Sequence, residues 1–80
     1  IPPTVSESDI VLQQLELKNE AFIGKSIRES ELREKTNGLV VGLERRGKRI
    51  LNPESQLILE KDDILWIVGS RKLLTNLSKN

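Results

Sequence analysis

An uninterrupted apolar run at residues 64–68 constrains the fold of this chain more than any other feature. The charged residues 61–63 precede the run, and Gly69 and Ser70 follow it. A run of this length, rich in β-branched and aromatic residues and bounded by turn residues, is typical of a strand buried on both faces. The run therefore predicts an interior strand with a packed layer on each side of the sheet. It also predicts that Trp66, the only tryptophan, lies in the core.

The size and composition of the chain predict a marginal core. Eighty residues make one small domain, and a chain of this length hides only about 60% of its extended surface on folding. The hydrophobic fraction is 36%, with one Trp, one Phe and no Tyr. We therefore expect a homodimer, because the helices carry too few apolar residues to cover both faces of a sheet. The chain begins without Met, so we also expect it to be a domain of a longer protein.

Cysteine and histidine are absent from the sequence. Their absence excludes disulfides, zinc fingers and Ser-His or Cys-His nucleophile pairs. The 13 basic and 12 acidic residues give a net charge of +1, so no overall field favours nucleic acid or an anionic membrane. No apolar segment approaches the roughly 20 residues that a membrane span needs. The sequence thus predicts no cofactor, no metal site and no nucleic-acid partner.

The order of predicted elements indicates an α+β domain. Residues 1–9 contain two prolines followed by small and acidic residues, which predicts a linker, and residues 10–80 form the domain. Strands are predicted at residues 10–17, 39–45, 48–52, 57–59 and 64–68, and helices at residues 26–37 and after Ser70. The resulting order is β-α-β-β-β-β-α, with two helices on a small antiparallel or mixed sheet.

Both predicted helices carry end signals. Ser26 and Glu29 fit a capping box, in which each side chain accepts a hydrogen bond from the backbone of the other residue. Asn37 and Gly38 supply a left-handed stop at the far end of that helix. Ser70 is placed to cap the last helix, whose predicted apolar stripe consists of Leu73, Leu74 and Leu77.

The clearest hairpin turns at residues 46–47. With these two as the turn, Leu43 faces Ile50 and Glu44 faces Arg49 across the strands. Apolar thus meets apolar and acid meets base, so the predicted register is consistent on both faces of the hairpin.

The acidic turn before the apolar run is the main candidate for catalysis. Glu60, Asp62 and Asp63 cluster there, but acid–base chemistry needs carboxylates with shifted pKa values in a dry cleft. We expect these side chains to be solvated. The turn also lacks the spacing of a calcium loop. The sequence therefore predicts no enzyme activity.

The hairpin tip at residues 45–49 is the only dense basic cluster. One reading is a solvated turn that Glu44 partly neutralises. The alternative is a contact with phosphates or lipid head groups. No aromatic residue interleaves the cluster, which disfavours stacking on single-stranded nucleic acid.

Taken together, the motifs resemble the TrkA-C domain, the C-terminal lobe of the RCK (regulator of potassium conductance) family. The resemblance runs from about residue 15 to residue 77. The sequence of these segments is most similar to that of lobes attached to monovalent cation:proton antiporters. The segments that carry it, in order, are residues 22–27 (FIGKSI), 38–45 (GLVVGLER), Gly47, 50–53 (ILNP) and 59–69 (LEKDDILWIVG).

The resemblance implies a cytosolic regulatory domain of a potassium or sodium/proton transport protein. Such a domain senses a ligand, dimerises, and acts on a membrane-embedded cation transporter to which it is fused or bound. The implied location is the cytoplasmic side of the inner membrane. The alternative is a purely structural dimerisation module of a transporter, with no small-molecule ligand.

The predicted ligand site lies in a cleft where two copies meet. Arg33 would bind an anion there, because a guanidinium presents a planar fork of donors. Leu39 is apolar where the cyclic-dinucleotide binders of the resembled family place a polar residue. We therefore expect weak or absent cyclic di-AMP binding, and either a different small anionic ligand or none. The candidate site residues are Arg33, Leu39, Val41, Ile50, Asn52 and Pro53.

Overall fold

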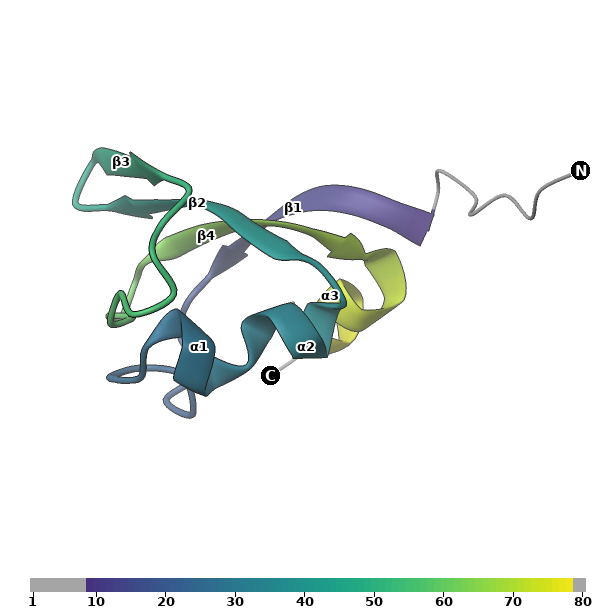
Figure 1. Cartoon of the computed structure of the whole chain (residues 1–80), viewed down its shortest axis with the longest axis horizontal. Coiled ribbons are helices and arrows are strands. Elements are labelled where there is room, and N and C mark those ends of the chain that lie inside the picture. Colours follow the sequence, from purple (N-terminus) through teal and green to yellow (C-terminus); the bar gives the residue numbers. More distant parts are fainter. Residues whose placement is uncertain (1–8, 79–80) are drawn as a thin grey trace, which may run out of the picture.

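The computed structural model describes residues 9–78, which form one four-stranded antiparallel sheet with three short helices. The sheet order is β1-β4-β2-β3. Figure 1 shows the three helices on one side of this sheet. Residues 1–8 of the predicted linker lie outside the described part. The elements are β1 (Ile10–Glu16), α1 (Ile27–Ser30), α2 (Leu32–Thr36), β2 (Leu39–Arg45), β3 (Lys48–Leu51), β4 (Ile64–Ser70) and α3 (Arg71–Ser78).

The α+β class is confirmed, although the order of elements differs from the predicted one at two places. The first is residues 57–59, where the predicted strand is replaced by an isolated bridge between Ile58 and Ser26. This segment bonds to the loop before α1 instead of to the sheet. Leu59 N–H donates to the Lys25 carbonyl at 2.8 Å, and Gly24 N–H donates to the Leu59 carbonyl at 2.8 Å. These bonds hold the segment beneath the sheet.

The second difference is the predicted helix at residues 26–37, which is two helices separated by Glu31 in a left-handed conformation (φ 57°). Ser30 competes for the backbone groups at the break, donating to the Ile27 carbonyl and accepting from Leu32 N–H. Ile27 and Leu32 are both buried. Five residues apart on one straight helix they would point about 140° apart, so the break lets both face the core.

The predicted end signals are confirmed at both ends of this segment. Ser26 Oγ accepts from Glu29 N–H at 3.0 Å, and a Glu29 carboxylate oxygen accepts from Ser26 N–H at 3.0 Å. The Ser26 N–H bond, with the Ser26 hydroxyl, holds the pKa of Glu29 below its ordinary value. At the other end Asn37 adopts the left-handed conformation (φ 53°) and ends α2.

The hairpin register is also confirmed. Leu43 pairs with Ile50 and Glu44 with Arg49. Arg46 and Gly47 both have positive φ, at 50° and 78°, as a tight two-residue hairpin turn requires.

α3 follows β4 directly. Ser70 Oγ accepts from Leu73 N–H at 3.3 Å, which confirms the predicted cap. Leu74 is buried and Leu77 is half-buried, but Leu73 is exposed, so the predicted stripe of three leucines is only partly right. Within residues 9–78 no helix is both long enough and apolar enough to cross a membrane.

The core lies between the sheet and the helices. β4 contributes Leu65 and Ile67, which are fully buried. The buried apolar side chains are Leu15, Leu17, Phe22, Ile27, Leu32, Val40, Leu43, Leu59, Leu65, Ile67 and Leu74.

The prediction that residues 64–68 are buried on both faces is wrong for this chain. Ile64, Trp66 and Val68 are only half-buried, so Trp66 lies outside the core cluster. They alternate along β4 with the buried Leu65 and Ile67 and therefore point to the opposite side of the sheet. Figure 1 shows no described helix on that side. The helices have four, five and eight residues and all pack on the opposite side. We call the uncovered side the open face. Strand pairing assigns to it Ile10, Leu12, Gln14, Glu16, Leu39, Gly42, Glu44, Arg49, Leu51, Ile64, Trp66, Val68 and Ser70.

Candidate functional site

A hollow of about 800 Å³ lies where the end of α2 meets the sheet. Two of the predicted site residues line it: Arg33 from α2 and Leu39, the first residue of β2. Among the described residues, the Arg33 guanidinium is exposed and has no hydrogen bond or ion pair. The full lining is Asp9, Ile10, Arg33, Glu34, Asn37, Gly38, Leu39, Val68, Gly69 and Ser70.

Two glycines bring α2 close enough to the sheet to form this hollow. A Cβ on Gly38 would collide with the Val68 carbonyl, and a Cβ on Gly69 would lie 2.6 Å from the Thr36 carbonyl oxygen. The end of α2 and the end of β4 therefore pack backbone against backbone. Arg33, one turn earlier in α2, is held beside the ends of the central strands β2 and β4 by this contact.

Arg33 also lines a second, smaller hollow of about 220 Å³ with Ile27, Arg28, Glu34 and Ser55. Arg28 N–H donates to the Ser55 carbonyl at 2.9 Å, so this hollow joins α1 to the loop after β3. Arg33 thus stands between two depressions in the surface, with carboxylates of its own chain beside it.

The other predicted site residues are not gathered in either hollow. Val41 sits at an irregularity where the β2–β4 register shifts, and its carbonyl accepts from Asn52 N–H at 2.9 Å. Ile50 lies on the edge strand β3, and Pro53 is buried. The structure therefore brings Arg33 and Leu39 to one hollow and places the remaining four predicted residues outside the lining of both hollows.

Sequence reasoning missed the contribution of the strand ends to the larger hollow. Ile10 and Ser70 are paired at the far end of the β1–β4 ladder, and both line it. A local pattern cannot reveal this contact, which depends on long-range pairing. Asn37 and Gly38 were recognisable from the sequence as a helix stop, and both also line the larger hollow.

The acidic turn and the basic tip bind each other. Arg45 donates to both carboxylate oxygens of Asp63, at 2.9 and 2.7 Å, and to the Ile58 carbonyl at 2.8 Å. A further ion pair joins Arg45 to Glu60 at 2.9 Å. Asp63 is 1% exposed and also accepts from Glu60 N–H at 2.8 Å. The hydrogen bonds to Asp63 raise the pKa of Arg45 above its ordinary value. The expectation that these side chains are solvated is therefore wrong for Asp63 and Arg45.

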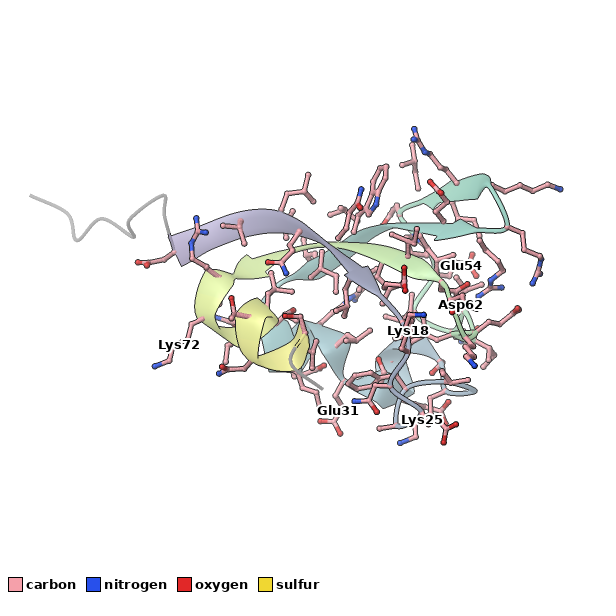
Figure 2. All side chains as sticks on the ribbon, turned by 180° about the vertical axis from the view of Figure 1, so that it is seen from behind. Lys18, Lys25, Glu31, Glu54, Asp62 and Lys72 are labelled. Carbon is pink, nitrogen blue, oxygen red and sulfur yellow. The ribbon has the colours of Figure 1, made fainter. Side chains whose placement is uncertain are left out.

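The rest of the basic tip is also largely neutralised. Arg46 pairs with Glu60 at 3.0 Å and Arg49 with Glu44 at 3.3 Å. Of the tip cations, only Lys48 has no ion pair among the described residues. A similar surface pairing links Lys18 to Asp62 at 3.6 Å, and Figure 2 shows these two side chains close together. No group of three potential metal ligands occurs within residues 9–78.

The described residues form a small α+β domain with one uncovered sheet face and an exposed arginine, Arg33, beside the ends of β2 and β4. The chain belongs to the TrkA-C domain family, whose model matches residues 12–80. It is 35% identical over 71 residues to a putative transport protein of Photobacterium profundum. That match covers 89% of this chain but only 13% of the relative.

Two solved structures share the fold. One is the RCK C domain of the potassium transport protein KtrA in complex with cyclic di-AMP, with a TM-score of 0.78 and 25% identity over 89% of this chain and 82% of that one. The other is the RCK_C domain dimer of Streptococcus agalactiae BusR in complex with cyclic di-AMP. It has a TM-score of 0.75 and 23% identity over 85% of this chain and 91% of that one, and it shows the fold alone.

Proposed function

We propose that this chain is a cytosolic regulatory domain of a potassium or sodium/proton transport protein, and that it senses a small anionic ligand and links two subunits. Membership of the TrkA-C family and the likeness to a transport protein support this role. The observation that carries the ligand-sensing part is the exposed Arg33, which lines two hollows and has no ionic partner among residues 9–78.

The proposed ligand carries phosphate or carboxylate groups. A guanidinium binds such groups through paired hydrogen bonds, and Leu39 offers an apolar side chain beside it. The KtrA relative binds cyclic di-AMP. In this chain a nucleobase edge placed against Leu39 would lose a hydrogen bond, at a cost of about 1–3 kcal/mol. We therefore propose that cyclic di-AMP binds weakly or not at all, and that another anion occupies the site.

The proposed partners are a second copy of the chain and a membrane-embedded cation transporter, fused or separate, at the cytoplasmic side of the inner membrane. The BusR relative is a dimer, which supports the first of these. We propose no nucleic-acid binding, because Arg45, Arg46 and Arg49 at the basic tip are engaged with carboxylates of the chain itself. We also propose no catalysis, because Asp63, the buried carboxylate of the acidic turn, is held by Arg45.

Titration calorimetry on the wild-type chain and on Arg33→Ala tests the ligand site. The probes are cyclic di-AMP, ATP and inorganic phosphate, and Lys48→Ala is the matched control because it removes an exposed cation at the opposite end of the sheet. We expect one anionic probe to bind the wild type and Lys48→Ala alike and to bind Arg33→Ala at least tenfold more weakly. Binding that Arg33→Ala leaves unchanged would remove this site. Micromolar cyclic di-AMP binding would refute the argument from Leu39.

A purely structural dimerisation module is the second candidate, and the open face favours it. It predicts that no probe raises the midpoint of thermal unfolding, because only a ligand that binds the native state does so. A dimer that binds none of the three probes would support this alternative over the sensing role.

A further inference from the structure

We propose that Arg28 and Arg33 form a two-arginine clamp, and that this clamp binds a doubly charged phosphate group in the smaller of the two hollows. The inference rests on the proposed anion sensing and deepens it, because it names a second binding residue and the charge of the bound group. The hollow has a volume of about 220 Å³, and its lining consists of Ile27, Arg28, Arg33, Glu34 and Ser55.

The two arginines occupy equivalent positions in a short repeated motif. Residues 27–29 are Ile-Arg-Glu and residues 32–34 are Leu-Arg-Glu, so each arginine directly follows a buried apolar residue. On one straight helix, positions five residues apart point about 140° away from each other. Arg28 and Arg33 would then lie on different sides of the helix and would not share a ligand.

The break at Glu31 brings the two arginines to one place. The left-handed Glu31 separates α1 from α2 and lets Ile27 and Leu32 both face the core. Within each helix, the next side chain is turned by about 100° from the one before it. Because the two buried side chains face the same core, the arginines that follow them are directed to a common side, where both line the smaller hollow.

The backbone that carries both arginines is held in place. Arg28 N–H donates to the Ser55 carbonyl at 2.9 Å, and Ile27 N–H donates to the Leu57 carbonyl at 3.0 Å, so α1 is bound to the loop after β3. The close approach of α2 to the end of β4 fixes the second arginine. A site whose backbone is already ordered loses less conformational entropy when a ligand binds.

Both guanidinium groups of the clamp are available to an anion. The two side chains are exposed, and neither has a hydrogen bond or an ion pair among residues 9–78, whereas every other arginine in that range has a partner. Glu34 lines the same hollow, but its carboxylate has no ion pair with a described residue either. Two like charges beside one hollow repel each other, and an anion between them replaces that repulsion by attraction.

The size of the hollow indicates a bound group of few atoms. Pockets for drug-sized ligands have volumes of roughly 300–1,000 Å³, and this hollow is smaller. A phosphate group is compact, and its oxygens accept paired hydrogen bonds from more than one guanidinium. A monocarboxylate has two oxygens and one charge, which a single arginine satisfies. The clamp therefore selects a phosphate dianion over a monocarboxylate.

This phosphate group has two possible sources, because the two hollows adjoin. Arg33 and Glu34 line both of them. The group is therefore either a free phosphate ion or the phosphate of a larger ligand whose body lies in the larger hollow, beside Leu39.

Titration with inorganic phosphate, followed by nuclear magnetic resonance at constant ionic strength and about pH 8, tests the clamp, because phosphate then carries close to two charges. The test variants are Arg28→Ala and Arg33→Ala, whose side chains are exposed, so the substitutions spare the core. The matched control is Lys25→Ala, which removes a positive charge close to Arg28 in the sequence but lines neither hollow. We expect the wild type and Lys25→Ala to bind phosphate alike, and both arginine variants to bind it at least tenfold more weakly.

Two further probes define the chemistry of the site. The wild type should bind phosphate at least tenfold more tightly than acetate, and Arg28→Ala should lose most of that preference, which a merely structural role of Arg28 would leave unchanged. Phenyl phosphate distinguishes the two sources. Affinity equal to that of inorganic phosphate indicates a free ion, and tighter binding that Leu39→Ala removes indicates a larger ligand; either result supports the clamp.

The outcomes separate this inference from the proposed function. Phosphate binding that Arg33→Ala weakens and Arg28→Ala leaves unchanged would overturn the clamp while leaving an anion site in the larger hollow. A wild type that binds no phosphate, but binds another calorimetry probe through Arg33, would do the same. An equal loss in Lys25→Ala would show unspecific attraction to positive charge and would also overturn the clamp. If no anionic probe binds the wild type, the proposed sensing role falls together with it.

Discussion

Replacing Arg45 by methionine should destabilise this domain more than any other single change at its surface. Arg45 has a side chain that is 17% exposed, and it supplies two of the three hydrogen bonds to the buried Asp63 carboxylate. Methionine has a similar length and keeps the apolar stem, so the variant removes the charge and the donors with little loss of packing.

The expected cost follows from what the substitution leaves behind. Asp63 stays in place with a single donor, Glu60 N–H, and with 1% of its surface in water. Removing one partner of a buried ion pair costs about 3–5 kcal/mol, because the remaining charge is uncompensated. An 80-residue domain has roughly 4–12 kcal/mol of stability in total, so the variant should lose at least a quarter of it.

Urea unfolding followed by Trp66 fluorescence measures this difference. The matched control is Arg46→Met, since Arg46 is the next residue, has a side chain that is 77% exposed, and also pairs with Glu60. An exposed pair of this kind is worth about 1 kcal/mol or less. The double variant Arg45→Met/Asp63→Asn should recover part of the loss, because it removes the stranded charge. A cost for Arg45→Met no greater than that of Arg46→Met, or a strictly additive double variant, would refute the reasoning.

Three further changes test other parts of the fold. Trp66→Ala should lower the free energy of unfolding of the monomer by about 2 kcal/mol, because the ring is half-buried. Leu65→Ala, on the side that the helices cover, should lower it by about 3–5 kcal/mol. Equal losses of unfolding free energy in urea would contradict the assignment of faces. Gly69→Ala should lower the thermal midpoint because its Cβ would lie 2.6 Å from the Thr36 carbonyl oxygen, and an unchanged midpoint would mean that α2 can move away at little cost. Glu29, whose pKa is lowered in the folded state, stabilises the fold above pH 4.5 and loses that contribution as the pH falls through its folded pKa. Glu29→Gln should therefore show a shallower loss of unfolding free energy in acid than the wild type, and parallel curves would contradict the role of the capping box.

The sequence was most informative where the determining contacts are local. The capping box at Ser26 and Glu29 and the left-handed stop at Asn37 each involve residues within one or two helical turns, so side-chain chemistry and spacing decide them. The hairpin register follows from a two-residue turn and from matched pairs on both faces. Arg33 and Leu39 line the same hollow because only the end of α2 and the start of β2 lie between them.

Long-range contacts explain what the sequence did not reveal. Arg45 and Asp63 are 18 residues apart, and each belongs to a charged cluster that, read alone, is typical of a solvated turn. Their pairing requires β2 and β4 to be neighbours, which no local pattern states. The break at Glu31 is equally hidden, because a non-glycine residue with positive φ gives no sequence signal and is fixed here by the need to bury both Ile27 and Leu32.

The apolar run at residues 64–68 shows why burial can be inferred from sequence while the covering element cannot. Leu65 and Ile67 are covered by the helices of the same chain, whereas Ile64, Trp66 and Val68 have no described element above them. Water is excluded from an apolar side chain equally well by its own chain or by a partner, so both situations select the same residue types. A strand whose residue types indicate burial on both faces can therefore have one face covered by helices of its own chain and the other face uncovered by any described residue, as β4 has here.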